Sequence, residues 1–200
     1  MGDTTLPVAR RVEWPTVAVA VAVYGGWSAI VVWHGALPWP VTAALLTVVV
    51  AWHGSLQHEV LHGHPFGIRW ADEVVGSIPL SLRLPYRVYR RSHLSHHGCA
   101  DLTDPATDTE SFFVTARTWE RLPVPGRWFL VVHHTLLGRI LLGPMVENGA
   151  MVRRDVAAVR AGDRSLLRWW STHIVTAAAL LWLVVSGAGV PLWTYLLGVY

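Results

Sequence analysis

The run WPTVAVAVAVYGGWSAIVVW, from Trp14 to Trp33, is strongly apolar and contains no charged side chain. A helix needs about 20 mostly apolar residues to cross a hydrocarbon core of about 30 Å. A second uncharged run, from Val41 to Leu56, follows after a short break. Pro40 suits the first turn of a helix, and no helix breaker precedes Gly63. We therefore expect a membrane-spanning hairpin of two helices, at about 14–33 and 41–62.

The overall composition agrees with a membrane protein. The chain has 200 residues, of which 52% are hydrophobic and 14% are charged, whereas soluble domains carry about 25% charged residues. The single cysteine, Cys99, excludes an internal disulfide framework and a cysteine-based zinc ribbon. Composition thus favours an integral membrane protein over a large soluble core.

The charged residues divide the chain into regions. All those that follow Glu13 lie between Glu59 and Arg168. A further uncharged apolar segment then predicts a third membrane helix at about 169–187, and 191–200 is the start of a fourth. The fold class that we expect is all-α, a single membrane domain of two helical hairpins with a histidine-rich helical region between them. The second hairpin is incomplete at the end of the sequence.

One apolar segment, at about 128–146, does not fit a simple crossing. It is long enough to span a membrane but contains His133, His134 and Arg139. An arginine at the bilayer centre costs about 2.5–3.5 kcal/mol even on the more lenient scale. We therefore expect an interfacial or re-entrant helix here.

The arginines predict the orientation of the chain. Fourteen of the sixteen lie between Arg69 and Arg168, and the other two, Arg10 and Arg11, precede the first membrane helix. Short loops rich in arginine stay on the cytoplasmic side. We expect the N-terminus and the whole middle region to be cytoplasmic.

Two histidine clusters in this middle region carry the chemistry. The first is HEVLH, with His58 and His62, and the second is HLSHH, with His93, His96 and His97. Side chains at i and i+4 of a helix have Cβ atoms about 5–6 Å apart, so each cluster presents imidazoles on one helical face. Five such histidines predict a metal site, although imidazole suits zinc, copper, iron and nickel alike.

Other polar residues admit more than one interpretation. Glu59 is either a ligand, a solvated charge or a carboxylate that orients the ligand histidines, and we prefer the last. Four arginines precede the second cluster: Arg83, Arg87, Arg90 and Arg91. They either contact lipid phosphates or form a docking surface for an acidic carrier or an electron donor. We interpret four of the six remaining histidines as polar residues at helix ends: His34, His53, His64 and His173. We interpret His133 and His134 as interfacial polar residues, with metal ligation as the alternative.

At these motifs the chain resembles the membrane fatty acid desaturase family. That family has an H-x(3,4)-H box after its first hairpin, here His58–His62, and an H-x-x-H-H box some thirty residues later, here His93–His97. The segments LTDP at 102–105 and DTES at 108–111 look like the bacterial pattern. The resemblance covers essentially the whole chain as an N-terminal portion of the family.

The resemblance implies a non-haem di-iron centre, with His58, His62, His93, His96 and His97 among the metal ligands. The implied reaction uses O2 to remove two hydrogens from an acyl chain, carried as a lipid or a thioester. It also implies an external electron donor such as a ferredoxin or cytochrome, surrounding membrane lipids and a bacterial inner (plasma) membrane location. No dinucleotide-binding fingerprint is present, and we expect no nucleic-acid partner.

The departure from the family pattern concerns its third box. The family carries another H-x-x-H-H box after its second hairpin and holds two irons with eight or more nitrogen ligands. No histidine follows His173 here, and five of the ligands are visible. We expect the sequence to be C-terminally truncated and the 200-residue chain alone to be inactive.

Alternative functions remain open at this point. Related hydroxylases and ketolases use similar histidine boxes. HEVLH also fits the H-E-x-x-H motif of zinc metalloproteases, with Glu59 as the general base, but the second cluster has no role in such an enzyme. A metal- or haem-binding membrane anchor would place its histidines within the bilayer rather than outside it.

Overall fold

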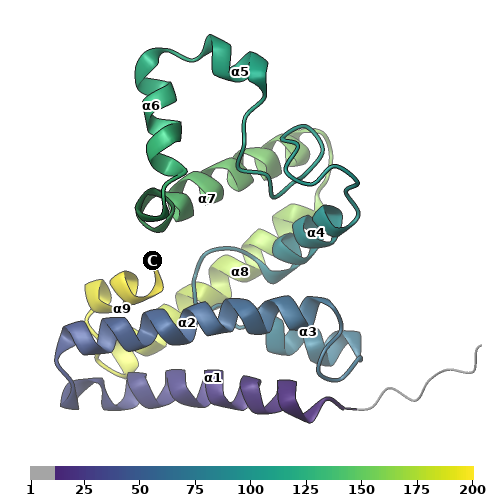
Figure 1. The fold of residues 1–200 in the computed structure, drawn as a ribbon. Coiled ribbons are helices and arrows are strands. Elements are labelled where there is room, and N and C mark those ends of the chain that lie inside the picture. The colour runs from purple at the N-terminus through teal and green to yellow at the C-terminus, as the bar shows by residue number, and fades with distance from the viewer. Residues whose placement is uncertain (1–11) are drawn as a thin grey trace, which may run out of the picture. The chain divides into compact units, whose positions relative to one another are not determined.

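The computed structural model describes residues 12–200 and contains helices and no strands in that part of the chain (Figure 1). The expected all-α fold is confirmed. A 3₁₀ turn at His34–Ala36 and a π-helical turn at Leu183–Gly187 accompany the α-helices. The α-helices are α1 Trp14–Trp33, α2 Trp39–Leu61, α3 Arg69–Ser77, α4 Tyr86–His97, α5 Ala116–Arg121, α6 Val124–His133, α7 Leu136–Arg160, α8 Ser165–Trp182 and α9 Leu192–Val199.

Three helical segments are long and apolar enough to cross a membrane: Trp14–Ala36, Trp39–Leu61 and Ser165–Gly187. The third begins four residues before the position that we expected. The Asp163 carboxylate accepts hydrogen bonds from the backbone N–H and the hydroxyl of Ser165, at 3.1 and 2.5 Å. A carboxylate beside the first free N–H groups favours helix initiation. The helix therefore begins among the arginines rather than at the first uncharged residue.

The chain divides into two compact units, which we describe separately. The first unit comprises the residues up to Leu82 together with Ile174–Tyr200, and the second comprises Arg83–His173.

In the first unit, Tyr195 of α9 connects three parts of the chain. Its side chain is fully buried, and its hydroxyl donates to the Leu80 carbonyl at 2.9 Å and accepts from Trp27 Nε1 at 3.3 Å. Close packing holds α9 against α2, because a Cβ on Gly198 would lie 2.7 Å from Leu46 Cβ and 3.1 Å from the Ala43 carbonyl oxygen. This packing fixes the helix that carries the first histidine cluster.

The substitution Gly198→Ala is expected to destabilise the first unit by about 1–3 kcal/mol, the usual cost of overpacking. Thermal and denaturant unfolding in detergent would measure the change. Gly25→Ala is the matched control, because a Cβ at that position has no neighbour within 4 Å. Equal unfolding midpoints for the two variants would contradict the close approach of α9 to α2.

In the second unit, Arg91 anchors α4. Its guanidinium donates to Asp163 at 2.7 Å, lies 3.6 Å from the Asp155 carboxylate and stacks over the Trp169 ring at 5.2 Å. Asp155 also accepts a 2.7 Å hydrogen bond from Trp170 Nε1. Arg91 thus has an internal structural role, in addition to the lipid or docking roles considered above.

The prediction of a single helix at 128–146 is wrong. The structure has two helices here, α6 and α7, and the chain bends by 108° between them. Thr135 causes the break: its side chain accepts from the Gly138 N–H at 3.0 Å and so caps the start of α7. A threonine cap satisfies N–H groups that a continuous helix would have bonded to the preceding turn.

Candidate metal centre

The first histidine cluster lies at the end of α2, in the first unit. His58 is in the last turn of the helix, and His62 is the residue that ends it. Their ring centroids are 5.0 Å apart, and one nitrogen of each ring lies within 4.8 Å of the other. The helix stops here because Gly63 adopts a φ of +96°, which glycine tolerates without steric cost. The i,i+4 spacing brings these two histidines together, as expected.

The second cluster lies on α4, in the second unit. This helix begins after Pro85 and ends at Gly98. His93 and His97 point at one another, with their Nε2 atoms 2.9 Å apart. The ring of His96 turns aside, and its centroid is 5.9 Å from those of both neighbours. The three rings share one region of the helix, but only His93 and His97 form a close pair.

The separation of the His93 and His97 nitrogens suits a bound metal ion. Two imidazole lone pairs facing each other at 2.9 Å repel, so either a proton or a cation has to lie between them. Imidazole nitrogens bind metals at about 2.0–2.1 Å, and two such bonds at a right angle place the nitrogens about 3 Å apart. The donor set of α4 therefore fits a metal.

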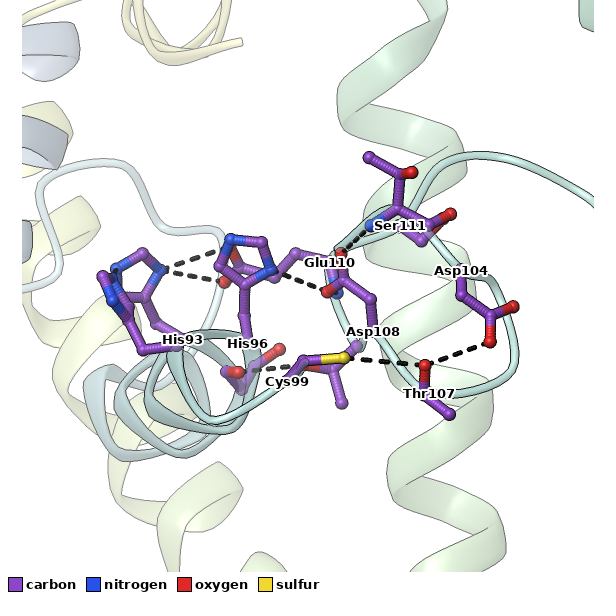
Figure 2. A network of polar contacts seen from close by, with 12 residues as sticks. His93, His96, Cys99, Asp104, Thr107, Asp108, Glu110 and Ser111 are labelled. Atoms are coloured by element: carbon purple, nitrogen blue, oxygen red, sulfur yellow. Dashed lines mark hydrogen bonds and ion pairs between the residues drawn. The ribbon is translucent and has the colours of Figure 1, made fainter. Parts of the chain in front are cut away.

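Two carboxylates contact the Nδ1 atoms of His93 and His96 (Figure 2). His93 Nδ1 lies 3.2 Å from both carboxylate oxygens of Glu110, and His96 Nδ1 lies 2.7 Å from Asp108. A carboxylate beside Nδ1 favours the tautomer with the proton on that nitrogen, which leaves Nε2 as a lone-pair donor. In both His93 and His96, Nε2 is then the nitrogen that could bind a metal ion.

Asp108 is itself firmly held. Its carboxylate accepts from the backbone N–H of Thr103 and of Glu110, each at 2.9 Å. The hydrogen bond from His96, together with these two backbone donors, lowers the pKa of Asp108 to about 2, and the same carboxylate raises the pKa of His96. Asp108 therefore stays ionised at any physiological pH.

The loop that carries both carboxylates is tied to α4. Thr109 Oγ1 donates to the Ser92 carbonyl at 2.9 Å, and Ser111 Oγ donates to the Thr103 carbonyl at 2.6 Å. Asp104 stabilises the turn by accepting from Thr107 Oγ1 at 3.1 Å. These contacts fix the loop in the register that places Asp108 and Glu110 behind the histidines.

Neither of these two carboxylates was assigned a role from the sequence motifs. Glu59 was preferred as the orienting carboxylate, but its side chain is exposed on α2, and it is the Glu59 backbone carbonyl that accepts from the His62 N–H, at 3.1 Å. The sequence did contain an indication, because two acidic residues follow the second cluster in the segment DTES at 108–111. Their role depends on a loop conformation that the sequence pattern does not reveal.

Two of the remaining histidines have structural partners, in keeping with their interpretation as polar residues at helix ends. His34 Nδ1 lies 2.8 Å from the Val31 carbonyl oxygen, and His64 Nδ1 lies 2.6 Å from the Glu13 carboxylate.

Comparison with known proteins identifies the family. The family model described as fatty acid desaturase matches residues 32–200, a range that includes both histidine clusters and the carboxylate loop. Comparisons with curated proteins and with solved structures gave no match. Because the family model covers well over half of the chain, the chain belongs to the fatty acid desaturase family.

Proposed function

We propose that this protein is an oxygen-dependent acyl desaturase with a non-haem di-iron centre. Membership in the desaturase family implies an oxidoreductase. The observation that carries the di-iron assignment is the His93–His97 pair, whose Nε2 atoms are 2.9 Å apart and whose neighbouring carboxylates leave nitrogen lone pairs for a metal.

We assign the metal-binding role to His58, His62, His93, His96 and His97. Bound iron would activate O2, which is needed because no protein side chain can remove hydrogen from an unactivated C–H bond by acid–base chemistry. The residues of this chain provide position: α2 and α4 present the imidazoles, while Glu110 and Asp108 hold the Nδ1 protons and so fix the tautomer and the orientation of the rings.

The substrate class and partners follow from the same proposal. The substrate is an acyl chain carried by a lipid or a thioester, and the electrons come from a separate donor such as a ferredoxin or cytochrome. The arginine distribution supports a cytoplasmic location for the histidine clusters, in the inner membrane of a bacterium.

Reconstitution of the natural full-length protein tests this function. Protein loaded with iron, in membranes containing saturated acyl lipids, would be supplied with O2 and a ferredoxin reducing system. We expect about two irons per chain, and an acyl product lighter by two hydrogens. A product heavier by one oxygen would instead show a hydroxylase, and stoichiometric zinc without iron would support the H-E-x-x-H protease alternative.

A further inference from the structure

The bend between α6 and α7 exposes a continuous set of large apolar side chains. We call residues 124–141 the elbow. Leu136 and Leu137, at the start of α7, are 78% and 65% exposed. Seven further large apolar side chains of the elbow are also exposed: Val124, Trp128, Phe129, Val131, Val132, Ile140 and Leu141. A soluble surface rarely presents so many adjacent apolar residues without a partner.

The backbone at the bend is paired within the elbow. His134 Nδ1 lies 2.7 Å from the Leu130 carbonyl oxygen, and Thr135 Oγ1 donates to the Val132 carbonyl at 2.7 Å. The same hydroxyl accepts from the Gly138 N–H at 3.0 Å. The ends of helices usually depend on water for these groups, and a chain that enters lipid has to satisfy them internally. Within the elbow the N–H groups of His134, Thr135 and Gly138 are satisfied in this way.

The bend is also sterically built in. A Cβ on Gly138 would lie 1.8 Å from the Val132 carbonyl oxygen, so only glycine permits α7 to pass this close to the end of α6. The turn of 108° therefore sends the chain back rather than onward. The geometry favours a structure that enters and leaves a membrane on one side.

The charges around the elbow are arranged for an anionic surface. Residues 128–138 contain no arginine and no acidic residue. Arg127 and Arg139 flank this apolar tip. Arg127 donates to the backbone carbonyls of Trp119, Glu120 and Leu122 at 2.9–3.1 Å. Arg139 lies over the Phe112 ring at 3.5 Å and 3.9 Å from the Glu147 carboxylate. Across residues 117–168 there are nine arginines and four acidic residues, an excess of five positive charges. Basic residues close to an anionic membrane surface are attracted to it.

We propose that the elbow inserts into one leaflet from the cytoplasmic side, to the depth of the boundary between headgroups and acyl chains, and binds anionic phospholipid there. The apolar tip enters the acyl region while the flanking arginines contact the phosphates. A full crossing would place Arg139 in the hydrocarbon, where a charged side chain is costly. This membrane contact is independent of the desaturase assignment.

Spectroscopy on the full chain in nanodiscs tests the depth of insertion. A dye on Leu137→Cys, in a Cys99→Ser background, is expected to lose fluorescence most strongly to a nitroxide placed near the headgroups, because interfacial helices lie about 5–10 Å deep. The matched control is Ala157→Cys, an exposed residue about 30 Å further along α7, where no such quenching is expected. Equal quenching at both sites would overturn the proposal.

Two further measurements distinguish the alternatives. Ala116→Cys and Ala161→Cys flank the α6–α7 pair, and both are expected to react with a membrane-impermeant maleimide from the same side of sealed vesicles. Labelling from opposite sides would show a crossing segment and overturn the proposal. Quenching at Leu137→Cys is expected to be stronger with phosphatidylglycerol than with phosphatidylcholine alone, and equal quenching would overturn the choice of anionic lipid.

Discussion

Replacement of His93 with glutamine is expected to remove at least one of the two proposed irons and to abolish product formation. His93 forms the closest imidazole pair on α4, with its Nε2 atom 2.9 Å from that of His97. Glutamine retains a polar side chain of similar length but lacks the imidazole nitrogen. Loss of a residue that merely orients a ligand costs about 10–100-fold in metal affinity, so loss of the ligand itself should cost more.

Ser95→Ala is the matched control for this substitution. Ser95 lies on the same helix, two residues from His93, and is exposed, so alanine there should leave the iron content unchanged. Elemental analysis of the purified proteins would give iron per chain, and circular dichroism with size-exclusion chromatography would confirm that both variants fold. A folded His93→Gln protein with the full iron content would rule out the assignment of His93 as a ligand.

The pairing within each histidine cluster could be predicted from the sequence because it is a local property. An α-helix brings residues at i and i+4 to the same face whatever surrounds it, and this geometry is found for His58 with His62 and for His93 with His97. The membrane-spanning helices were predictable for a similar reason, since a long uncharged apolar run has few alternatives to a membrane helix.

The carboxylates could not be assigned in this way, because their contacts are tertiary. Glu110 lies 17 residues after His93, and Asp108 lies 12 residues after His96. The loop that follows α4 and carries both carboxylates has no regular pattern of apolar and polar residues. Only its folded conformation shows which carboxylate contacts which ring. Glu59 was preferred because it lies within the first cluster, but it points about 100° away from the adjacent His58 on the helix, and its side chain is exposed.

The break between α6 and α7 is an intermediate case. Hydropathy alone indicated one long segment, because apolar residues continue through the bend. The threonine at 135 followed by glycine at 138 was a local indication of a new helix, since threonine is a favoured N-cap. The continuous apolar pattern nevertheless favoured a single segment, although the Thr135 cap determines where the chain turns.

The substitution Asp108→Asn is expected to weaken iron binding by about 10–100-fold, the usual effect of losing a carboxylate that orients a ligand histidine. One oxygen of Asp108 accepts from His96 Nδ1 and from the Glu110 N–H, and the other accepts from the Thr103 N–H. An asparagine has only one oxygen, so in either orientation its amide N–H₂ faces a donor. The His96 ring then loses either its carboxylate partner or the fixed loop that holds it.

Asp101→Asn is the matched control, because Asp101 lies in the same loop and is exposed, and its contacts with Asp104 and Cys99 use its backbone carbonyl. Titration of the iron-free proteins with Fe(II) under anaerobic conditions would give the two affinities. The same iron affinity for Asp108→Asn and Asp101→Asn would contradict an orienting role for Asp108. A selective loss for Asp108→Asn, with helix content unchanged, would show that the loop after the second histidine cluster contributes to the metal site and does not serve only as a connection between helices.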